Sequence, residues 1–583
     1  MDDADLLILV GQAMTWRDAD PDPRTRRELD LLIERCTGGD ERQRQSSLDD
    51  LRQRFSAGLS FGTAGLRGAL GAGPNRMNRA VVIRAAAGLA AFLSQRIPEP
   101  GSGDERPPRI VVGYDARRDS DVFARDTCGV LLAAGCTPLL LPGQLPTPVL
   151  AFAVRHLCAD AGVMVTASHN PPSDNGYKVY LGGRIDRTDG RGAQIVSPHD
   201  REIAEEIESA PVAIDVPMSA GGWEQVPASI VDEYLAAVLG VLDPATPRAL
   251  DIVITPLHGV GGETAVRAFS LAGFPVPHMV PEQAAPDPAF PTVVSPNPEE
   301  TGAMDLALAS AKSRGADLVI ANDPDADRCA VAVPSGGGWR MLRGDEVGAL
   351  LGMYALSRAP DATRLTVANS IVSSQLLSRI AAAYGATYVQ TLTGFKWLTR
   401  VPGVDYAYEE ALGYCVAPDV VRDKDGISAA LLVAELAARL KTSGRTLLDA
   451  LDDLARDHGL HATGQFSIRV ADLAEIPVML RRLTGSPPAR LAGQQVISAQ
   501  DLSEGVDGLP PTEGLRYRTE GGCRAIVRPS GTEPKLKVYL EAVVPVSSQP
   551  QGISRAQASA SAALDALRAD LLSALGMPGA AFS

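Results

Sequence analysis

The sequence passes from a strand to a polar loop at the stretch Thr166-Ala-Ser-His-Asn-Pro-Pro-Ser-Asp-Asn175. The preceding run, Ala161-Gly-Val-Met-Val165, is apolar and predicts a buried strand. The loop itself is rich in Pro, Asn, Asp and Ser, which favour turns and cannot continue the strand. Ser168 is therefore presented at a strand end, where its hydroxyl can take part in chemistry. Taken alone, the pattern is explained equally well by an ordinary turn.

Strands and helices alternate on both sides of this stretch. The predicted strands of this part of the chain are Arg109 to Val112, Thr137 to Leu141, Gly162 to Val165, Asp251 to Ile254, Asp317 to Ile320, Leu365 to Ala368 and Thr387 to Gln390. Helix-like segments such as Asp121 to Ala134, Asp305 to Arg314 and Ser373 to Tyr384 lie between them. This spacing predicts βαβ units and parallel or mixed sheets, which bind ligands in the loops after their strands.

The chain has 583 residues, too many for a single hydrophobic core. Breaks are expected near Pro211 to Trp223, near Pro334 to Gly338 and near Thr442 to Arg456. We therefore predict a helical leader with a first α/β domain (1–210), two further α/β domains (211–338 and 339–455) and a smaller α+β domain (456–583). The fold class is thus α/β with mixed sheets in three domains, plus an α+β C-terminal domain.

Composition limits the classes of partner. The formal net charge of −15 argues against nucleic acid and anionic membranes as partners. No apolar run reaches the roughly 18 to 20 residues of a membrane span, and the acidic start Met1-Asp-Asp-Ala-Asp5 does not resemble a signal peptide. The seven cysteines are scattered and form no CxxC pair, so reduced thiols and a cytoplasmic location are expected. An anionic ligand would need a locally basic site.

A second motif, Asp323-Pro-Asp-Ala-Asp-Arg328, follows a predicted strand. The carboxylates of Asp323, Asp325 and Asp327 can converge on one hard cation, and oxygen ligands of this kind suit Mg²⁺. The alternative is a solvated acidic turn. The twelve-residue pattern of an EF-hand is not present.

A third motif, Arg528-Pro-Ser-Gly-Thr-Glu-Pro-Lys535, lies between the predicted strands Arg524 to Val527 and Lys535 to Ala542. Arg528 offers two donors to phosphate oxygens, Ser530 and Thr532 offer hydroxyls, and Gly531 offers an exposed N–H group. The spacing differs from that of a P-loop. A basic hairpin turn is the simpler alternative.

Three further features give weaker indications of a ligand-binding site: an acidic pair, a glycine-rich loop and scattered basic residues. In Tyr408-Glu-Glu-Ala-Leu-Gly-Tyr414, the carboxylates of Glu409 and Glu410 could accept hydrogen bonds from sugar hydroxyls, although an ordinary strand end explains them as well. The glycine-rich loop Phe61-Gly-Thr-Ala-Gly-Leu-Arg-Gly68 carries Arg67. Together with Arg67, the cations that could form a basic pocket are Lys178, Arg328, Lys396 and Arg528, each of which is otherwise an ordinary surface charge.

Four of these motifs occur in the order of the signature loops of the α-D-phosphohexomutases. They are Thr166 to Pro171, Asp323 to Arg328, Glu409-Glu410 and Arg528 to Thr532. The chain thus resembles the phosphoglucomutase/phosphomannomutase family over roughly residues 50 to 545. The Phe61 to Gly68 loop and the helical leader are similar to the branch that also contains phosphopentomutases.

The resemblance implies a heart-shaped molecule of four domains and assigns a role to each motif. Ser168 would be the phosphorylated residue, and one Mg²⁺ ion per subunit would bind to the phosphorylated Ser168 and to Asp323, Asp325 and Asp327. Lys178 matches the family's acid/base candidate, and His169 and Arg67 resemble the groups around the reacting phosphoryl. The substrate-binding residues would be Glu409, Glu410, Lys396, Arg328, Arg528, Ser530, Gly531 and Thr532.

The expected activity is that of an intramolecular phosphotransferase that interconverts sugar 1-phosphates and 6-phosphates through a phosphoserine and a sugar bisphosphate, which also serves as activator. Hexose-specific relatives commonly have Glu-x-Ser where this chain has Glu409, Glu410 and Ala411. Glucose phosphate is favoured, with mannose and pentose phosphates as alternatives. A haloacid-dehalogenase-like phosphatase using Asp323-Pro-Asp325 and a non-catalytic sugar-phosphate sensor are the rival readings. The protein is expected to be a monomer or a homodimer.

Overall fold

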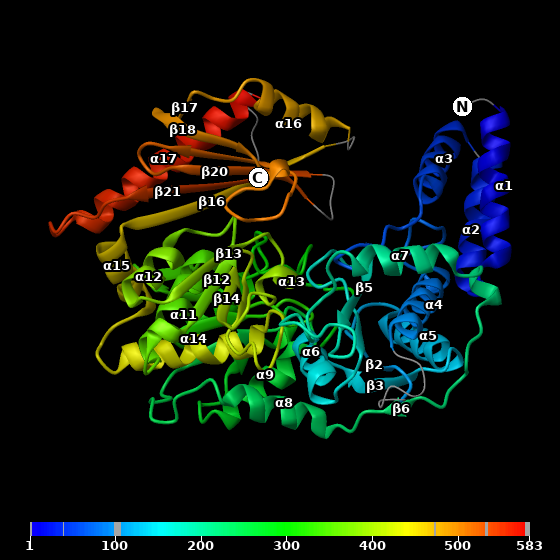
Figure 1. Cartoon of the computed structure of the whole chain (residues 1–583), viewed down its shortest axis with the longest axis horizontal. Coiled ribbons are helices and arrows are strands. Elements are labelled where there is room, and N and C mark those ends of the chain that lie inside the picture. The colour runs from blue at the N-terminus through cyan, green and yellow to red at the C-terminus, as the bar shows by residue number, and fades with distance from the viewer. Residues whose placement is uncertain (1–2, 39, 98–105, 471–473, 531–534, 578–583) are drawn as a thin grey trace. The chain divides into compact units, whose positions relative to one another are not determined.

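The computed structural model describes residues 3–38, 40–97, 106–470, 474–530 and 535–577 (Figure 1). The chain divides into two compact units. The first unit comprises Met1–Met341 and Gly413–Glu435, and the second comprises Leu342–Leu412 and Leu436–Ser583.

The first unit begins with three helices, α1 (Asp3–Ala19), α2 (Pro23–Thr37) and α3 (Glu41–Phe55). Helix α2 begins at Pro23, whose missing N–H costs nothing at that position, and Asp22 caps it by accepting from the Arg24 N–H at 2.9 Å. Apolar side chains at helical spacing, including those of Leu29, Leu32 and Leu51, form the core between the helices. The predicted helical leader is confirmed.

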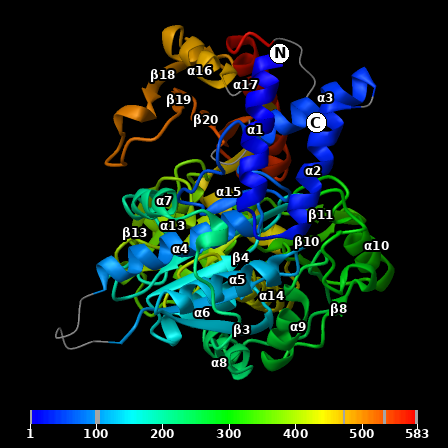
Figure 2. The same ribbon diagram turned by 90° about the vertical axis from the view of Figure 1, so that its right-hand side faces the viewer.

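The first sheet of this unit has the strand order β1-β5-β4-β2-β3-β6. Its strands are β1 (Leu66–Ala69), β2 (Arg109–Tyr114), β3 (Thr137–Gln144), β4 (Ala161–Val165), β5 (Asp174–Leu181) and β6 (Glu224–Gln225). Strands β2, β3, β4 and β6 run parallel, whereas β5 is antiparallel to β4 and to β1. The helices are α4 (Arg79–Arg96), α5 (Ser120–Ala133), α6 (Thr147–His156) and α7 (His199–Ser209). Figure 2 shows α5 and α6 against β3 and β4.

The second sheet of the first unit has the order β11-β10-β9-β7-β8. Its strands are β7 (Ile252–Thr255), β8 (His278–Met279), β9 (Leu318–Ala321), β10 (Ala330–Ser335) and β11 (Gly338–Met341). Strands β7, β8 and β9 are parallel, β10 is antiparallel to β9, and β11 is antiparallel to β10. The helices are α8 (Ser229–Leu239), α9 (Gly261–Leu271) and α10 (Asp305–Arg314), and β15 (Gly413–Cys415) also belongs to this unit.

The second unit contains the parallel strands β12 (Thr366–Ser370), β13 (Thr387–Thr391) and β14 (Val404–Glu409). Their helices are α11 (Gly344–Arg358), α12 (Leu376–Tyr384), α13 (Phe395–Leu398) and α15 (Leu447–His458). Helix α14 (Gly426–Lys441) spans the chain boundary between the units.

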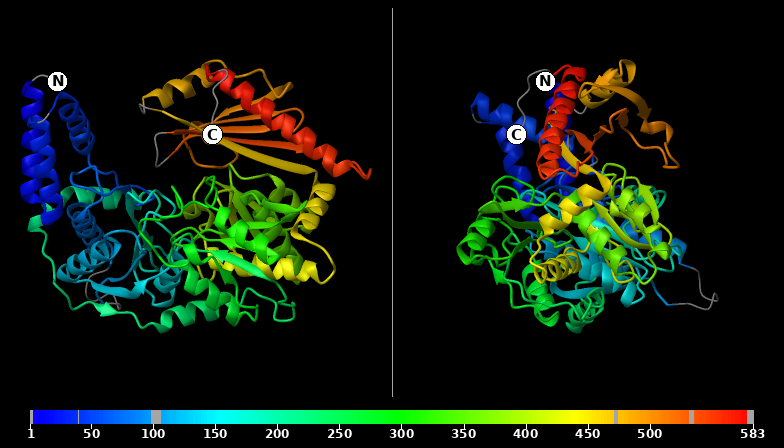
Figure 3. Two further views of the ribbon diagram at one scale, coloured as in Figure 1. Left: turned by 180° about the vertical axis from the view of Figure 1, so that it is seen from behind. Right: turned by 90° about the vertical axis from the view of Figure 1, so that its left-hand side faces the viewer.

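The end of the second unit is a sheet of the order β16-β21-β20-β19-β18-β17, in which every pair is antiparallel. Its strands are β16 (Leu460–Arg469), β17 (Arg490–Leu491), β18 (Gln494–Asp501), β19 (Leu515–Thr519), β20 (Arg524–Pro529) and β21 (Lys535–Val544). The helices are α16 (Glu475–Gly485) and α17 (Gly552–Ala574). Figure 3 shows α17 lying along this sheet, where Leu567 and Leu571 join the core under β16 and β21.

These sheets confirm the predicted fold class, with mixed α/β sheets followed by an α+β end. All seven cysteines are free thiols, as predicted, and all but Cys158 are buried. In the described part of the chain, no helix combines the length and the apolar composition that crossing a membrane requires.

Candidate active site

The Ser168 loop joins β4 to β5 in the first unit. Ser168 has a φ angle of 52°, in the left-handed region that costs a non-glycine residue about 1–3 kcal/mol and is common at functional sites. A relay of hydrogen bonds holds this conformation, because the Ser168 N–H donates to the Thr166 hydroxyl at 2.9 Å and that hydroxyl donates to Asp115 at 2.6 Å. The strained backbone fixes where the Ser168 hydroxyl lies.

Arg117 holds the same loop from the inside. Its guanidinium donates to four main-chain carbonyls, those of Ser168 (2.6 Å), Asn170 (2.5 Å), Pro171 (2.8 Å) and Asp174 (3.0 Å). The Arg117 side chain is 1% exposed and lies 3.6 Å from the Asp115 carboxylate. One buried cation thus organises the whole turn.

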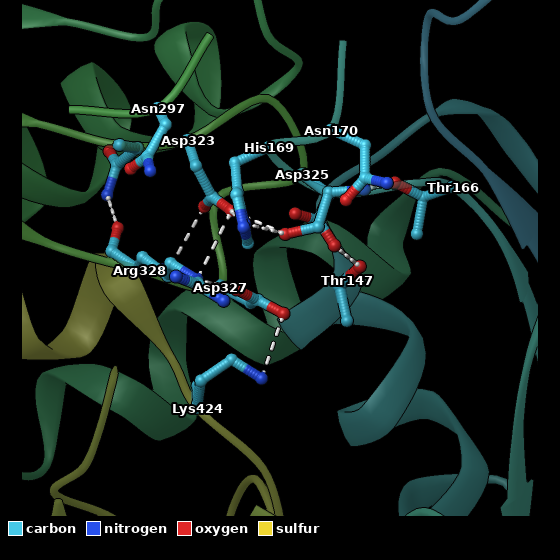
Figure 4. Close-up of polar contacts among 12 residues, drawn as sticks. Thr147, Thr166, His169, Asn170, Asn297, Asp323, Asp325, Asp327, Arg328 and Lys424 are labelled. Atoms are coloured by element: carbon cyan, nitrogen blue, oxygen red, sulfur yellow. Dashed lines mark hydrogen bonds and ion pairs between the residues drawn. The ribbon is translucent and has the colours of Figure 1, made fainter. Parts of the chain in front are cut away.

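The three aspartates predicted to bind metal lie close together in this unit (Figure 4), and Ser168 contacts one of them. They lie in the loop between β9 and β10, all are buried, and their ligand oxygens lie within 4.8 Å of one another. The Ser168 hydroxyl donates to Asp323 Oδ2 at 2.7 Å. Asp325 Oδ1 and Asp327 Oδ1 are buried and accept no hydrogen bond. Converging oxygens without hydrogen-bond donors fit a hard cation such as Mg²⁺.

Close backbone packing shapes this loop. A Cβ on Gly259 would lie 2.4 Å from Pro324 Cα, and a Cβ on Gly426 would lie 2.1 Å from the Arg328 carbonyl oxygen. No real side chain tolerates such distances. Both glycines therefore let neighbouring segments support the aspartate loop from behind.

Cations surround the three carboxylates. Lys178 Nζ lies 2.7 Å from Asp325 Oδ2 and 2.9 Å from Asp327 Oδ2, and Lys424 Nζ lies 3.1 Å from Asp327 Oδ2. Arg328 Nε lies 3.7 Å from both Asp323 and Asp327. The basic groups that a phosphate would need are therefore present beside Ser168.

Burial and charge shift the pKa values of these groups in opposite directions. Burial raises the pKa of Asp323 well above its usual range, and the neighbouring carboxylates of Asp327 and Asp325 raise it further. Burial would also raise the pKa of Asp327, but the ammonium groups of Lys178 and Lys424 lower it. Burial would lower the pKa of Lys178, but Asp325 and Asp327 raise it. The ammonium form of Lys178 is therefore favoured, and this group can donate a proton.

Arg67 and His169 also reach the Ser168 loop. Arg67 Nη1 donates to Asn170 Oδ1 at 3.1 Å, and burial lowers the pKa of Arg67. His169 Nδ1 lies 3.3 Å from the Ser168 hydroxyl and 4.0 Å from Asp323 Oδ2. The first unit thus brings together Ser168, His169, Lys178, Arg67, Arg328 and the three aspartates.

Thr147 supports the aspartate cluster from the first turn of α6. Its hydroxyl donates to Asp325 Oδ2 at 2.6 Å, and its N–H donates to the Asp325 carbonyl at 2.9 Å. We expect Thr147→Val to weaken metal binding by about 10- to 100-fold, the usual effect of losing a group that orients a ligand. Mn²⁺ titration followed by electron paramagnetic resonance measures this directly. Thr147→Ser keeps the hydroxyl and should bind Mn²⁺ like the wild type; equal binding by the valine variant would contradict the role.

The sugar-loop residues lie in the second unit. Glu409 ends β14 and accepts from the Gly394 N–H at 2.5 Å, and Gly394 has a φ angle of 112° that favours glycine. Arg528 donates to the Thr393 hydroxyl. Arg528 and Glu409 therefore meet at the Thr393–Lys396 segment, which also carries Lys396.

Other predicted residues of this unit have different surroundings. The Glu410 carboxylate accepts from Ser373 at 2.9 Å and from Ser370 at 3.2 Å, so it is held by the end of β12. The Ser530 N–H donates to the Lys535 carbonyl at 2.9 Å, which closes the Arg528 loop. Gly531 and Thr532 lie outside the described residues.

Asp345 is a buried carboxyl group near Glu410. It accepts from the Ser374 N–H at 2.7 Å and from the Tyr408 hydroxyl at 3.1 Å. Burial raises its pKa from 3.8 to about 7, and the charges of Glu410 and Glu541 also raise it. Below pH 4 the group is protonated in the folded and unfolded chain alike. As the pH rises from about 4 to about 7, the unfolded chain releases the proton first, so the folded state loses stability.

We therefore expect Asp345→Asn to stabilise the protein at pH 8, by up to about 4 kcal/mol, and to have little effect at pH 4. Thermal unfolding of both proteins across this pH range measures the difference. Asp457→Asn removes an exposed carboxylate of α15 and should show no such trend. A difference between Asp345→Asn and the wild type that does not grow with pH would contradict the prediction.

Three functional side chains were missed by the sequence analysis. Arg117 follows a predicted strand, Thr147 begins a helix, and Lys424 lies in the polar turn Asp423-Lys-Asp-Gly426. Arg117 and Lys424 lie in loops next to strands or helices, where ligand-binding residues are common, but nothing in the sequence indicated which distant segments they contact. Thr147 carried no signal.

Family models match most of the chain in four successive parts. Domains I, II and III of phosphoglucomutase/phosphomannomutase (alpha/beta/alpha) match residues 58–212, 232–337 and 343–457, and the C-terminal domain matches residues 467–547. The chain belongs to the phosphoglucomutase/phosphomannomutase family. It is therefore a phosphosugar mutase, as the sequence motifs predicted.

Individual relatives agree with this assignment. A probable phosphomannomutase of Haemophilus influenzae is 46% identical over 80% of this chain and 93% of its own length. A phosphopentomutase of Mus musculus is 35% identical over 94% of this chain and 92% of its own length. The crystal structure of a putative phosphomannomutase from Thermus thermophilus covers 88% of this chain and 98% of its own, with 25% identity and a TM-score of 0.65.

Proposed function

We propose that the protein interconverts glucose 1-phosphate and glucose 6-phosphate, with Ser168 as the phosphoryl carrier. The observation that supports this most is the Ser168 hydroxyl 2.7 Å from Asp323, among three carboxylates and several cations. A serine alone is a weak nucleophile and a weak phosphate acceptor. A serine in a rigid, strongly charged site is suited to phosphoryl transfer, which depends on positioning and charge neutralisation.

In the proposed reaction, the bond between Ser168 Oγ and phosphorus breaks while a sugar hydroxyl oxygen bonds to the same phosphorus. Lys178, which Asp325 and Asp327 hold protonated, is our candidate for the proton exchange. It donates a proton to Ser168 Oγ as the bond to phosphorus breaks, and it takes up the proton of the sugar hydroxyl. The sugar bisphosphate then returns its other phosphoryl group to Ser168. Arg67 and Arg328 balance charge on the transferred group.

A Mg²⁺ ion held by Asp323, Asp325 and Asp327 would supply further positive charge to the phosphoryl oxygens. In the second unit, Glu409 binds sugar hydroxyls, and Arg528 with Ser530 binds the phosphate that is not transferred. Glu410 and Lys396 complete the proposed substrate contacts. A sugar bisphosphate serves as the activator because it can phosphorylate Ser168.

Pentose phosphate is the second candidate substrate. Ala411 offers no hydroxyl where hexose-specific relatives commonly have serine, and the mouse relative is named a phosphopentomutase. Initial rates on glucose 1-phosphate, mannose 1-phosphate and ribose 1-phosphate, with a bisphosphate activator, separate the candidates. A higher kcat/KM for glucose 1-phosphate than for the other two supports the proposal. A higher value for mannose 1-phosphate or ribose 1-phosphate would contradict it and identify that compound as the preferred substrate.

A further inference from the structure

A second basic pocket lies in the first unit, with a volume of about 520 Å³. The C-terminal end of α6, the loop after β5 and residues 419–420 line it. We call it the arginine pocket, after Arg106, Arg155, Arg184 and Arg191, which line it together with His156 and Asp419.

The arginine pocket is separate from the Ser168 site. Helix α6 begins at Thr147, which contacts Asp325, and ends at His156, which lines the pocket. These ten residues span about 15 Å of helix. The catalytic site and the arginine pocket therefore lie at opposite ends of α6.

Arg155 and Arg191 carry positive charge that no carboxylate of the described residues pairs with. Arg155 donates to the main-chain carbonyls of Arg191 and Asp419, both at 3.1 Å. Within the described ranges, neither Arg155 nor Arg191 forms an ion pair with a carboxylate. Burial lowers the pKa of Arg155, and the charges of Arg422 and Arg191 lower it further. Like charges thus face one another, which an anion between them would relieve.

The other basic groups that line the pocket already lie beside carboxylates. Arg184 pairs with the buried carboxylate of Asp160 at 2.5 Å, and Arg106 lies 4.0 Å from the same group. His156 pairs with Glu233 at 2.7 Å. Arg106 and Arg184 thus have a carboxylate beside them, whereas Arg155 and Arg191 form no ion pair within the described ranges. The positive charge of Arg155 and Arg191 is therefore available to an anion, although the whole chain has a formal charge of −15.

The backbone is built to receive the two arginine side chains. A Cβ on Gly192 would lie 2.5 Å from Arg155 Cγ, and a Cβ on Gly183 would lie 2.8 Å from Arg191 Cδ. The aliphatic part of each arginine lies directly on a glycine. The aliphatic part of each side chain is therefore held against the backbone, while Arg155 is partly buried and Arg191 is exposed.

We propose that the arginine pocket binds a phosphate group of a small phosphorylated molecule. Guanidinium groups match phosphate oxygens in geometry and charge. The pocket volume is within the usual range for small-ligand sites. A metal ion is disfavoured by the positive charge, and the acidic chain disfavours a nucleic acid.

Isothermal titration with inorganic pyrophosphate, in phosphate-free and magnesium-free buffer, tests the proposal. Pyrophosphate can also occupy the proposed active site, so the comparison between variants decides. Arg191→Glu and Arg155→Met should each lower the affinity of one binding event at least tenfold. Arg187→Glu is the matched control, because Arg187 is exposed on the same loop but does not line the pocket.

Near-ultraviolet circular dichroism checks that each variant is folded, independently of any mutase activity. Arg191 is exposed, so its substitution should leave the fold intact even if Arg155→Met does not. The proposal is overturned if folded Arg191→Glu protein binds pyrophosphate like the wild type. It is also overturned if Arg187→Glu loses as much affinity, because the effect would then be one of general charge.

Discussion

Ser168→Ala is expected to lower kcat on the best sugar phosphate by a factor on the order of 10⁴ or more, as removal of a nucleophile does. The Ser168 hydroxyl is the one that faces Asp323, and no other hydroxyl of the described residues donates to that carboxylate. We also expect intact mass spectrometry to detect a phosphoryl group on the wild-type protein and none on the variant. Loss of both the activity and the phosphoryl mass supports a mutase that works through Ser168.

Ser173→Ala is the matched control. Ser173 lies on the same loop, is exposed, and its hydroxyl donates to its neighbour Asp174. It should keep wild-type kcat and the phosphoryl mass. Full activity of Ser168→Ala would exclude the proposed carrier, whereas sugar-phosphate binding without turnover in the wild type would favour the sensor.

The charges around Ser168 determine whether a phosphorylated Ser168 is stable, and they indicate a need for a metal ion. A phosphoserine brings a charge of about −1.5 to −2, and it would lie beside three buried carboxylates. Lys178, Lys424 and Arg328 offset part of this charge. We therefore expect metal removal by chelation to reduce turnover sharply, and Mg²⁺ to restore it.

The sequence predicted the elements that local pattern controls. The run Ala161 to Val165 is entirely buried, and continuous apolar runs of this kind are typical of central strands. The aspartate loop was also predictable, because three carboxylates two residues apart have few structural uses. Both signals lie within a few consecutive residues.

Other parts of the site could not be read from the sequence, because they depend on contacts between distant segments. Thr147 is 178 residues from Asp325, and Lys424 is 97 residues from Asp327. Strands β1 and β6 have only four and two residues, too short for a pattern. Glu410 was grouped with Glu409 because they are adjacent, yet the structure gives the two carboxylates different partners.

Arg117 shows how such a distant contact can carry function. Arg117→Ala removes the donor to four loop carbonyls and leaves the buried Asp115 carboxylate without its cation. Breaking a buried ion pair in this way costs about 3–5 kcal/mol. A displacement of Ser168 by about 1 Å can lower the rate about 100-fold. We therefore expect kcat to fall by about two to three orders of magnitude, while KM changes little.

The split between kcat and KM separates positioning from general damage, because Arg117 touches the loop that carries Ser168 and no proposed sugar contact. Arg117→Lys keeps the charge near Asp115 but cannot reach four carbonyls in one plane, so it should recover stability more than kcat. Arg118→Ala changes the exposed neighbouring side chain and should behave like the wild type. If Arg117→Lys matches the wild type in kcat, the charge of residue 117 is sufficient and its grip on the loop is not what positions Ser168.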